Sequence, residues 1–405
     1  MLTIQANSDE KRKKKFLKRF KEKWASHSKC RQVIEGAWRQ RVGGSPMFCL
    51  FQRIRNTRLA LIKWEKRAFG DTKVALQQKQ WLLEELTRRN DPALMDRIRE
   101  TKIEINNLLH QEELAWRQRS RAIWLSAGDK NTKFFHQRAT QRKRKNQIRG
   151  LFNKIGEWCS DEEQIVDTAV EYFQDLFTSS QPEDEEIGLV LEAVDQRITD
   201  DMNNTLMEPY TGDEVRRALF QMHPSKAPGP DGMSPFFFQK FWSIVRHDVT
   251  SAILSALNSG RFLHKMNYTH IALVPQKNDP QSLGDFRPIS LGNVISRLFS
   301  KVLANRLNQI LPRVISDAQS AFIPERIIID NTTIAFEVLH RMRNRRRGKD
   351  GQMAIKLDIS KDYDRVEWQF LKKMMLRLRF DERWVALAME TIHTASYSIL
   401  INGEP

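Results

Sequence analysis

Apolar residues recur at helical spacing through residues 10–125, among many lysine, arginine, glutamine and glutamate residues. The repeating positions are Leu76, Leu83, Leu86, Ile105, Leu108 and Leu109. This periodicity predicts a mainly helical region. Asn90-Asp91-Pro92 interrupts the pattern with helix-breaking residues, so we predict two long helices in antiparallel or coiled contact.

The strongest amphipathic helix is predicted over residues 290–311. Its apolar positions are Leu291, Val294, Leu298, Val302, Leu303, Leu307 and Ile310. A strand is predicted at Ile271–Val274, where four apolar residues follow one another.

Two other segments should be irregular. Ser179–Glu186 is polar, acidic and interrupted by proline, which is typical of a linker, and His223–Gly232 is rich in proline and glycine, which predicts an ordered loop.

The last sixty residues predict a strand, a helix and a second strand. Apolar and polar residues alternate through 353–358, which predicts a half-buried strand with Asp358 on its outer face. A helical pattern follows at Val366, Phe370, Met374 and Leu378. Ser396–Ile401 reads as a strand, and Asn402-Gly403 is a strong two-residue hairpin signal. Since the sequence stops two residues later, we expect that it was cut inside a fold, with a frayed tail as the alternative.

The chain carries a formal net charge of +17, which indicates a polyanionic partner. The charge is uneven: residues 1–150 hold 37 Lys and Arg against 15 Asp and Glu, whereas residues 151–210 hold 2 against 16. A basic run near Phe134 and Phe135 is suited to pairing with phosphates and stacking on bases. It consists of Arg142, Lys143, Arg144 and Lys145. The alternatives are a solvated basic surface and aromatic residues that belong to the core.

The sequence also excludes several classes of protein. Three widely spaced cysteines, Cys30, Cys49 and Cys159, favour a reducing compartment over a disulfide framework or a zinc site. No apolar run approaches the roughly 20 residues of a membrane span, and no signal peptide precedes the lysines at residues 11–15. We therefore expect an intracellular protein, in the nucleus or the cytoplasm.

Asp358 ends a predicted strand just before a turn and a helix, a position suited to hold a divalent metal. Polymerases use two metals roughly 3.5–4 Å apart to activate the attacking hydroxyl and stabilise the leaving group. Magnesium takes hard oxygen ligands, commonly one or two carboxylates together with substrate phosphates. A single aspartate is not sufficient for this chemistry, and in isolation it is more often a helix cap or turn residue.

The residues around Asp358 change that interpretation. Lys356–Trp368 (KLDISKDYDRVEW) closely resembles the first catalytic motif of non-LTR (LINE-type) retrotransposon reverse transcriptases, especially those of plant elements. The preceding motifs of that family appear in the same order. They are GDKNTKFFH at Gly128–His136, KAPGPDG at Lys226–Gly232, DFRPISL at Asp285–Leu291, QSAF at Gln319–Phe322 and the pair Asp330-Asn331. The resemblance covers most of the chain.

The resemblance implies roles for individual residues. Asp358 would ligate catalytic Mg²⁺ or Mn²⁺, and Tyr363 would act as the steric gate that selects deoxynucleotides. Arg287 would contact the incoming triphosphate, since a guanidinium suits phosphate oxygens. Lys277 would substitute for a family lysine that this chain replaces with Gln276. The remaining implied contacts are Ile359 and Lys361 beside the triphosphate, and Lys226 on the nucleic acid.

Three departures from the family pattern stand out. Asp362 replaces an alanine, and two like charges about 4 Å apart repel by on the order of 4 kcal/mol at an effective dielectric of 20. Glu325 replaces a glycine, which we expect to disturb a tight turn. The aromatic-x-Asp-Asp motif that supplies further metal ligands is absent, because the pair Asp200-Asp201 comes far too early in the sequence.

Together these patterns predict an α+β fold: a helical basic N-terminal region followed by a partial right-hand polymerase with fingers and an incomplete palm. The predicted divisions are a basic helical region (1–115) that would follow a missing endonuclease, a basic-then-acidic connecting region (116–210) and the N-terminal part of a reverse transcriptase domain (211–405). The expected partners are an RNA template, a DNA primer or target and dNTP, with no membrane. We expect the fragment by itself to be inactive. The alternatives are a non-catalytic nucleic-acid-binding protein derived from the same element and an unfolded product.

Overall fold

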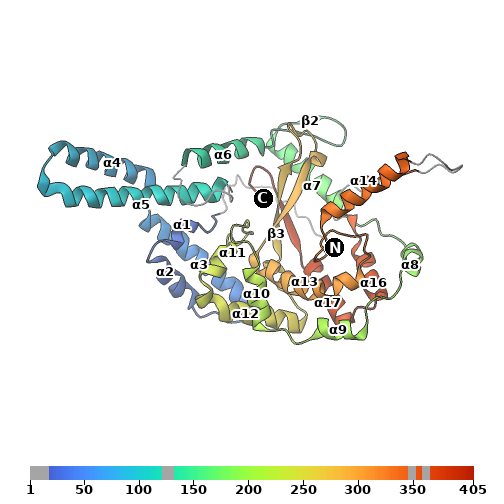
Figure 1. The fold of residues 1–405 in the computed structure, drawn as a ribbon. Coiled ribbons are helices and arrows are strands. Elements are labelled where there is room, and N and C mark those ends of the chain that lie inside the picture. The colour runs from blue at the N-terminus through green and yellow to red at the C-terminus, as the bar shows by residue number, and fades with distance from the viewer. Residues whose placement is uncertain (1–17, 121–131, 345–352, 358–364) are drawn as a thin grey trace.

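The computed structural model describes residues 18–120, 132–344, 353–357 and 365–405. These parts of the chain contain helices, a two-stranded sheet and a three-stranded mixed sheet (Figure 1). The predicted α+β class is therefore confirmed at the level of mixed helix and sheet. No helix within the described ranges has the length and apolar character needed to cross a bilayer.

The N-terminal part of the chain is helical, as predicted. Its helices are α1 (Glu22–Ala25), α2 (Cys30–Trp38), α3 (Pro46–Ala68), α4 (Thr72–Arg89), the 3₁₀ helix η1 (Pro92–Leu94) and α5 (Met95–Ser120). Helices α4 and α5 lie side by side as a long hairpin that projects from the body (Figure 1). Asn90 ends α4 in the left-handed conformation (φ 45°), and the Asp91 side chain accepts a hydrogen bond from the Ala93 N–H. The predicted break between two long helices is confirmed.

A connecting region follows. It contains α6 (Thr132–Lys145), the short strands β1 (Leu151–Phe152) and β2 (Trp158–Cys159), α7 (Glu162–Phe177), α8 (Asp184–Glu192) and α9 (Asp200–Met207). Strands β1 and β2 pair antiparallel, which the sequence patterns did not predict. Helix α8 begins inside the segment that we predicted as a linker, because Glu183 and Glu186 form a capping box at its start. The linker is therefore shorter than predicted.

The C-terminal half surrounds a three-stranded sheet. Its elements are α10 (Gly212–Phe220), α11 (Pro235–Lys240), α12 (Trp242–Ser259), η2 (His264–Met266), β3 (Tyr268–Pro275), η3 (Leu283–Asp285), β4 (Phe286–Gly292), α13 (Val294–Val314), α14 (Ile328–Asn344), α16 (Trp368–Arg377), α17 (Glu382–His393) and β5 (Ser396–Leu400). The strand order is β4-β3-β5. Strand β3 pairs antiparallel with β4 and parallel with β5, so Ile271 faces Ser290 on one side and Ile399 on the other.

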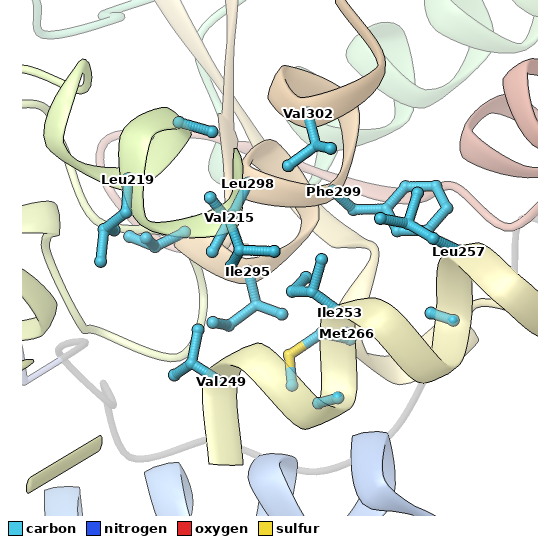
Figure 2. Close-up of a cluster of buried hydrophobic side chains, with 14 of the residues drawn as sticks. Val215, Leu219, Val249, Ile253, Leu257, Met266, Ile295, Leu298, Phe299 and Val302 are labelled. Atoms are coloured by element: carbon cyan, nitrogen blue, oxygen red, sulfur yellow. The ribbon is translucent and has the colours of Figure 1, made fainter. Parts of the chain in front are cut away.

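One large hydrophobic core joins the N-terminal helices to the C-terminal half. Figure 2 shows its centre, where side chains of α10, α12 and α13 meet around Ile295 and Leu298. Each fully buried aliphatic side chain of this kind contributes about 1.5–3 kcal/mol by leaving water. Helices α2 and α3 reach α12 through polar contacts as well: the Trp38 indole N–H donates to Asp248 Oδ2 at 2.7 Å, and Arg53 forms an ion pair with the same carboxylate.

A second core covers one face of the sheet. Ile165 and Phe173 of α7 and Leu151 of β1 pack there with Ile271 and Phe286. The connecting region is thus held against the sheet by apolar contacts. This packing includes Ile148, which follows α6 and contacts the turn after β5, as described below.

Several predicted elements appear where we expected them. Strand β3 contains the predicted strand Ile271–Val274, β5 contains most of the predicted strand near the end, and residues 223–234 form no helix or strand. Asn402 (φ 51°) and Gly403 (φ 93°) make the predicted tight turn, closed by a bridge between Ile401 and Glu404.

Two predictions were wrong. The helix predicted over residues 290–311 begins only at Val294, because Leu291 pairs with His270 as part of β4. The strand predicted through residues 353–358 is not formed over its described part, 353–357: Met353 is 80% exposed and Leu357 is 84% exposed. Alternation is a local signal, whereas a strand needs a neighbour for its backbone groups, and none of the described strands pairs with this segment.

Candidate nucleotide and nucleic-acid interface

The predicted nucleotide-binding residues Lys277 and Arg287 lie on the hairpin formed by β3 and β4. Lys277 follows the end of β3 and Arg287 is the second residue of β4, where it pairs with Val274. The Arg287 side chain is exposed, while the neighbouring Phe286 is buried in the core that covers the sheet. The structure thus brings both cations to the same end of one hairpin.

Lys277 is already paired with an acid of the DFRPISL motif. Its ammonium lies 2.9 Å from Asp285 Oδ1. Burial opposes ionisation of Asp285, but hydrogen bonds from Lys277 and from the backbone N–H groups of Ser282 and Gln281 outweigh it and lower the pKa to about 2. Asp285 therefore stays ionised at neutral pH and holds Lys277 in this position.

The predicted catalytic segment falls outside the described residues. Asp358, Ile359, Lys361, Asp362 and Tyr363 all lie in the undescribed stretch 358–364. Elsewhere in the chain, the described residues contain no group of three His, Cys, Asp or Glu side chains that could hold a metal ion.

The downstream end of the same motif is anchored at Glu367. Its carboxylate accepts hydrogen bonds from the Ser179 hydroxyl at 2.7 Å and from the Ser180 N–H at 2.9 Å. The bond from Ser179 is the main cause that lowers the pKa of Glu367. The connection before α8 is therefore tied to the start of α16.

The loop at residues 223–232, which contains the KAPGPDG motif, is fixed by close packing. A Cβ atom at Gly229 would lie 2.5 Å from the Asn293 backbone nitrogen, so this position requires glycine. The Asn293 side chain accepts from the Asp231 N–H at 3.0 Å and donates to the Met266 carbonyl at 2.8 Å. Arg58 of α3 donates to the Pro230 carbonyl at 3.1 Å. The loop therefore joins three parts of the fold.

Asp231 is the electrostatically unusual residue of this loop. Its Oδ2 atom is buried without a hydrogen-bond partner, while Oδ1 accepts from the Met233 N–H. Burial raises the pKa of Asp231 to about 6, and the nearby Arg58 and Arg297 only partly oppose this shift. The carboxylate stabilises the loop backbone by accepting this hydrogen bond, but its negative charge destabilises the folded state because it is buried.

The QSAF motif and the Asp330-Asn331 pair meet in space. The Ser320 hydroxyl donates to Asn331 Oδ1 at 2.7 Å. Between them Glu325 adopts a left-handed conformation (φ 68°), and Arg326 donates to the Gln319 carbonyl at 2.7 Å. Glu325 therefore adopts a conformation that glycine would reach with less strain, and its effect on the turn stays a prediction.

The predicted basic run occupies the last turn of α6. All four of its side chains, Arg142 through Lys145, are exposed. The chain that follows is held to the turn after β5, because the Asn402 side chain accepts from the Ile148 N–H at 2.8 Å and donates to the Ile148 carbonyl at 3.0 Å. This two-point contact brings the basic run close to the end of the sheet.

Lys226, the other predicted nucleic-acid contact, is exposed and does not join that run. It lines a separate groove of about 890 Å³, together with the segment Lys18–Lys23 and part of α5. Gly403 also reaches this groove. Nothing in the sequence patterns connected α5 with the loop at residues 223–232.

Comparison with known proteins agrees with the motifs. Residues 274–403 match the sequence model of a family described as reverse transcriptase (RNA-dependent DNA polymerase). The chain is 29% identical over 324 residues to the Transposon TX1 uncharacterized 149 kDa protein of Xenopus laevis, an alignment that covers 79% of this chain and 24% of that protein. These findings support a reverse transcriptase of the non-LTR retrotransposon type.

Two further relatives come from insect elements. A retrovirus-related Pol polyprotein from the type-1 retrotransposable element R2 of Nasonia vitripennis is 26% identical over 186 residues, covering 44% of this chain and 17% of that protein. The corresponding polyprotein from the type-2 element R2DM of Drosophila melanogaster is 30% identical over 143 residues, covering 35% and 12%. The chain spans about a quarter or less of the length of the relatives that it matches.

Proposed function

We propose that this chain is part of a plant-like non-LTR retrotransposon reverse transcriptase and contains its fingers and the first part of its palm. The observation that carries the proposal is the family match over residues 274–403, within which the motifs stand in the expected order. The β3–β4 hairpin with Arg287 would belong to the fingers. The complete enzyme would synthesise DNA on an RNA template, primed on nicked target DNA.

The proposed chemistry centres on Asp358, which would ligate Mg²⁺ or Mn²⁺. A divalent ion would activate the attacking hydroxyl and stabilise charge on the leaving group. Arg287 would bind the triphosphate, and Tyr363 would exclude ribonucleotides. Lys277 would contact the triphosphate as well, because the ion pair with Asp285 leaves further N–H donors of its ammonium for a phosphate.

We further propose that these 405 residues by themselves do not polymerise nucleotides, because the aromatic-x-Asp-Asp motif is not among them. The purified chain should incorporate no labelled dTTP on poly(rA)·oligo(dT) with either Mg²⁺ or Mn²⁺. Incorporation that disappears in Asp358→Ala would overturn the inactivity but support the role of Asp358. Incorporation that survives this substitution would contradict that role.

A second candidate function is non-catalytic binding of nucleic acid, which the exposed basic run on α6 favours. This function requires an affinity that falls steeply with salt and is unchanged in Asp358→Ala. Fluorescence anisotropy at about 50 and 200 mM salt would test it. For a protein that makes several phosphate contacts, the affinity for nucleic acid falls by about 10³–10⁵-fold between these two concentrations. Salt-independent binding, or none, would exclude it.

A further inference from the structure

The groove beside Lys226 has walls that are fixed by hydrogen bonds. The Phe20 N–H donates to the Gly232 carbonyl at 2.8 Å, and the Gln118 side chain donates to the Phe20 carbonyl at 3.0 Å. Gln118 also accepts from the Glu22 N–H at 3.2 Å. The segment Lys18–Lys23 is therefore held between the loop at residues 223–232 and α5, and the groove is a built feature of the fold.

The lining of this groove is strongly basic. Among the described residues, eight lysine and arginine residues line it against three acidic ones. The cations come from separate parts of the chain: Lys21 and Lys23 precede or start α1, Lys73 begins α4, Arg119 ends α5, and Lys226 belongs to the loop. Cations drawn together from distant segments favour a polyanionic ligand over a chance run of charge.

The cations also repel one another. The pKa of the Lys23 ammonium is lowered, first by burial and then by the charges of Lys21 and Arg119, which Glu65 only partly offsets. Lys21 is engaged by Glu65, whereas no ion pair within the described residues involves Lys73 or Lys226. A bound phosphate would relieve this repulsion.

An aromatic side chain lies among these cations. Trp116 lines the groove, with the His136 ring 4.3 Å from its centroid and the Arg119 guanidinium 5.0 Å above it. Indole rings and arginine guanidinium planes both stack on unpaired bases. Arg119 and Trp116 thus form a column that provides a stacking surface next to phosphate-binding cations. The His136 ring is inclined by 58° to the indole and supports Trp116 without lining the groove.

The volume of the groove and its stacking surface favour a single strand over a duplex. Its 890 Å³ falls within the range of about 300–1,000 Å³ that holds compact ligands. A few nucleotides of one strand fit such a volume, whereas the bases inside a duplex are paired and stacked on one another and are not free to stack on Trp116. Bases of a single strand are free to turn toward the stacking column.

We propose that this groove binds a single strand of nucleic acid, with phosphates on Lys73 and Lys226 and one base stacked on the column of Arg119 and Trp116. This site deepens the nucleic-acid-binding part of the proposed function and rests on it. It does not depend on Asp358 or on polymerase activity. Of the lining residues that the structure describes, all except Gly403 lie outside the segment that matches the reverse transcriptase family.

The test uses the full chain, a fluorescein-labelled 12-nucleotide RNA and the same RNA as a duplex, followed by fluorescence anisotropy. Trp116→Ala should weaken binding of the single strand about 5- to 150-fold, since stacking contributes about 1–3 kcal/mol per base. Trp116→Phe should retain most of the affinity. Trp81→Ala is the matched control, because Trp81 is 65% exposed on α4 and does not line the groove.

Two lysine substitutions test the contribution of charge to binding. Lys226→Gln should weaken binding and reduce the slope of log affinity against log salt by about 0.7, the value for one phosphate contact on a single strand. Lys265→Gln removes an exposed lysine outside the groove and should leave the slope unchanged. Thermal melts of all variants would separate lost binding from lost folding.

The outcomes distinguish the two proposals. If the wild type binds and the Trp116→Ala and Trp81→Ala variants bind with equal affinity, the proposed binding site in the groove is contradicted. Binding of nucleic acid elsewhere on the protein would remain supported. Equal losses for single strand and duplex would overturn the single-strand preference. No binding by the wild-type chain at low salt would remove the proposed nucleic-acid partner and, with it, this site.

Discussion

The loop at residues 223–232 is irregular yet tightly packed, whereas the segment at residues 353–357 is rich in apolar residues yet exposed. The loop approaches Asn293 so closely that a methyl group at Gly229 has no room. In the exposed segment, Ile355 retains 68% of its accessible surface. The difference shows that packing depends on a partner surface and not on hydrophobicity alone.

The neighbouring helix α14 behaves like the exposed segment. None of its described side chains is buried, and Ile334 and Phe336 are 60% and 69% exposed. In Figure 1 the helix extends away from the body. By contrast, α13 buries Ile295, Leu298 and Phe299 against two other helices (Figure 2). Three substitutions test whether packing differs in this way between the two regions.

The largest effect is expected from Gly229→Ala. The new Cβ would meet backbone atoms of Asn293 and Gly292 at 2.5 and 2.6 Å, which cannot move without displacing the start of α13. We expect a loss of about 3 kcal/mol in the free energy of unfolding, measured by urea denaturation. Gly36→Ala is the control: nothing lies within 4 Å of its Cβ position in α2, and the change should stabilise the protein by up to about 1 kcal/mol. Equal effects of the two substitutions would show that the loop is not tightly packed.

A slightly smaller and pH-dependent effect is expected from Asp231→Asn. The folded protein raises the pKa of Asp231 from 3.8 to about 6, so it binds this proton more tightly than the unfolded chain does. The contribution of Asp231 to stability is therefore highest below about pH 4 and falls as the pH rises through 6, by on the order of 3 kcal/mol in total. Asp231→Asn removes this dependence. Its unfolding free energy relative to the wild type should increase between pH 4 and pH 7.5, and a constant difference would contradict the burial of the charge.

The smallest effect is expected from Ile355→Ala, which should change the unfolding free energy by less than about 0.5 kcal/mol because the side chain is exposed. Ile295→Ala, the same substitution at a fully buried position, should cost about 2–5 kcal/mol. Urea denaturation of both variants would measure the contrast. If Ile355→Ala cost as much as Ile295→Ala, the segment at residues 353–357 would be packed in solution, and the comparison would fail.

Local signals determined much of the fold. Residues that favour helix ends, such as Asn90 and Asp91, placed the break between α4 and α5, because their preferred conformations depend only on neighbouring residues. The same holds for the turn at Asn402-Gly403, where both residues take positive φ. The motif order predicted the reverse transcriptase match over residues 274–403, since motifs are properties of the sequence itself.

Tertiary structure decided what local signals could not. Leu291 satisfies a helical pattern, yet it joins β4 because His270 provides a hydrogen-bonding neighbour there. Lys18 and Lys226 both line the groove, although about two hundred positions separate them in the sequence. Gly403, which also reaches the groove, is more distant still. No periodicity reports such proximity. Which charged and aromatic side chains meet depends on how the helices pack, and that packing is set by the shared core and not by any one segment.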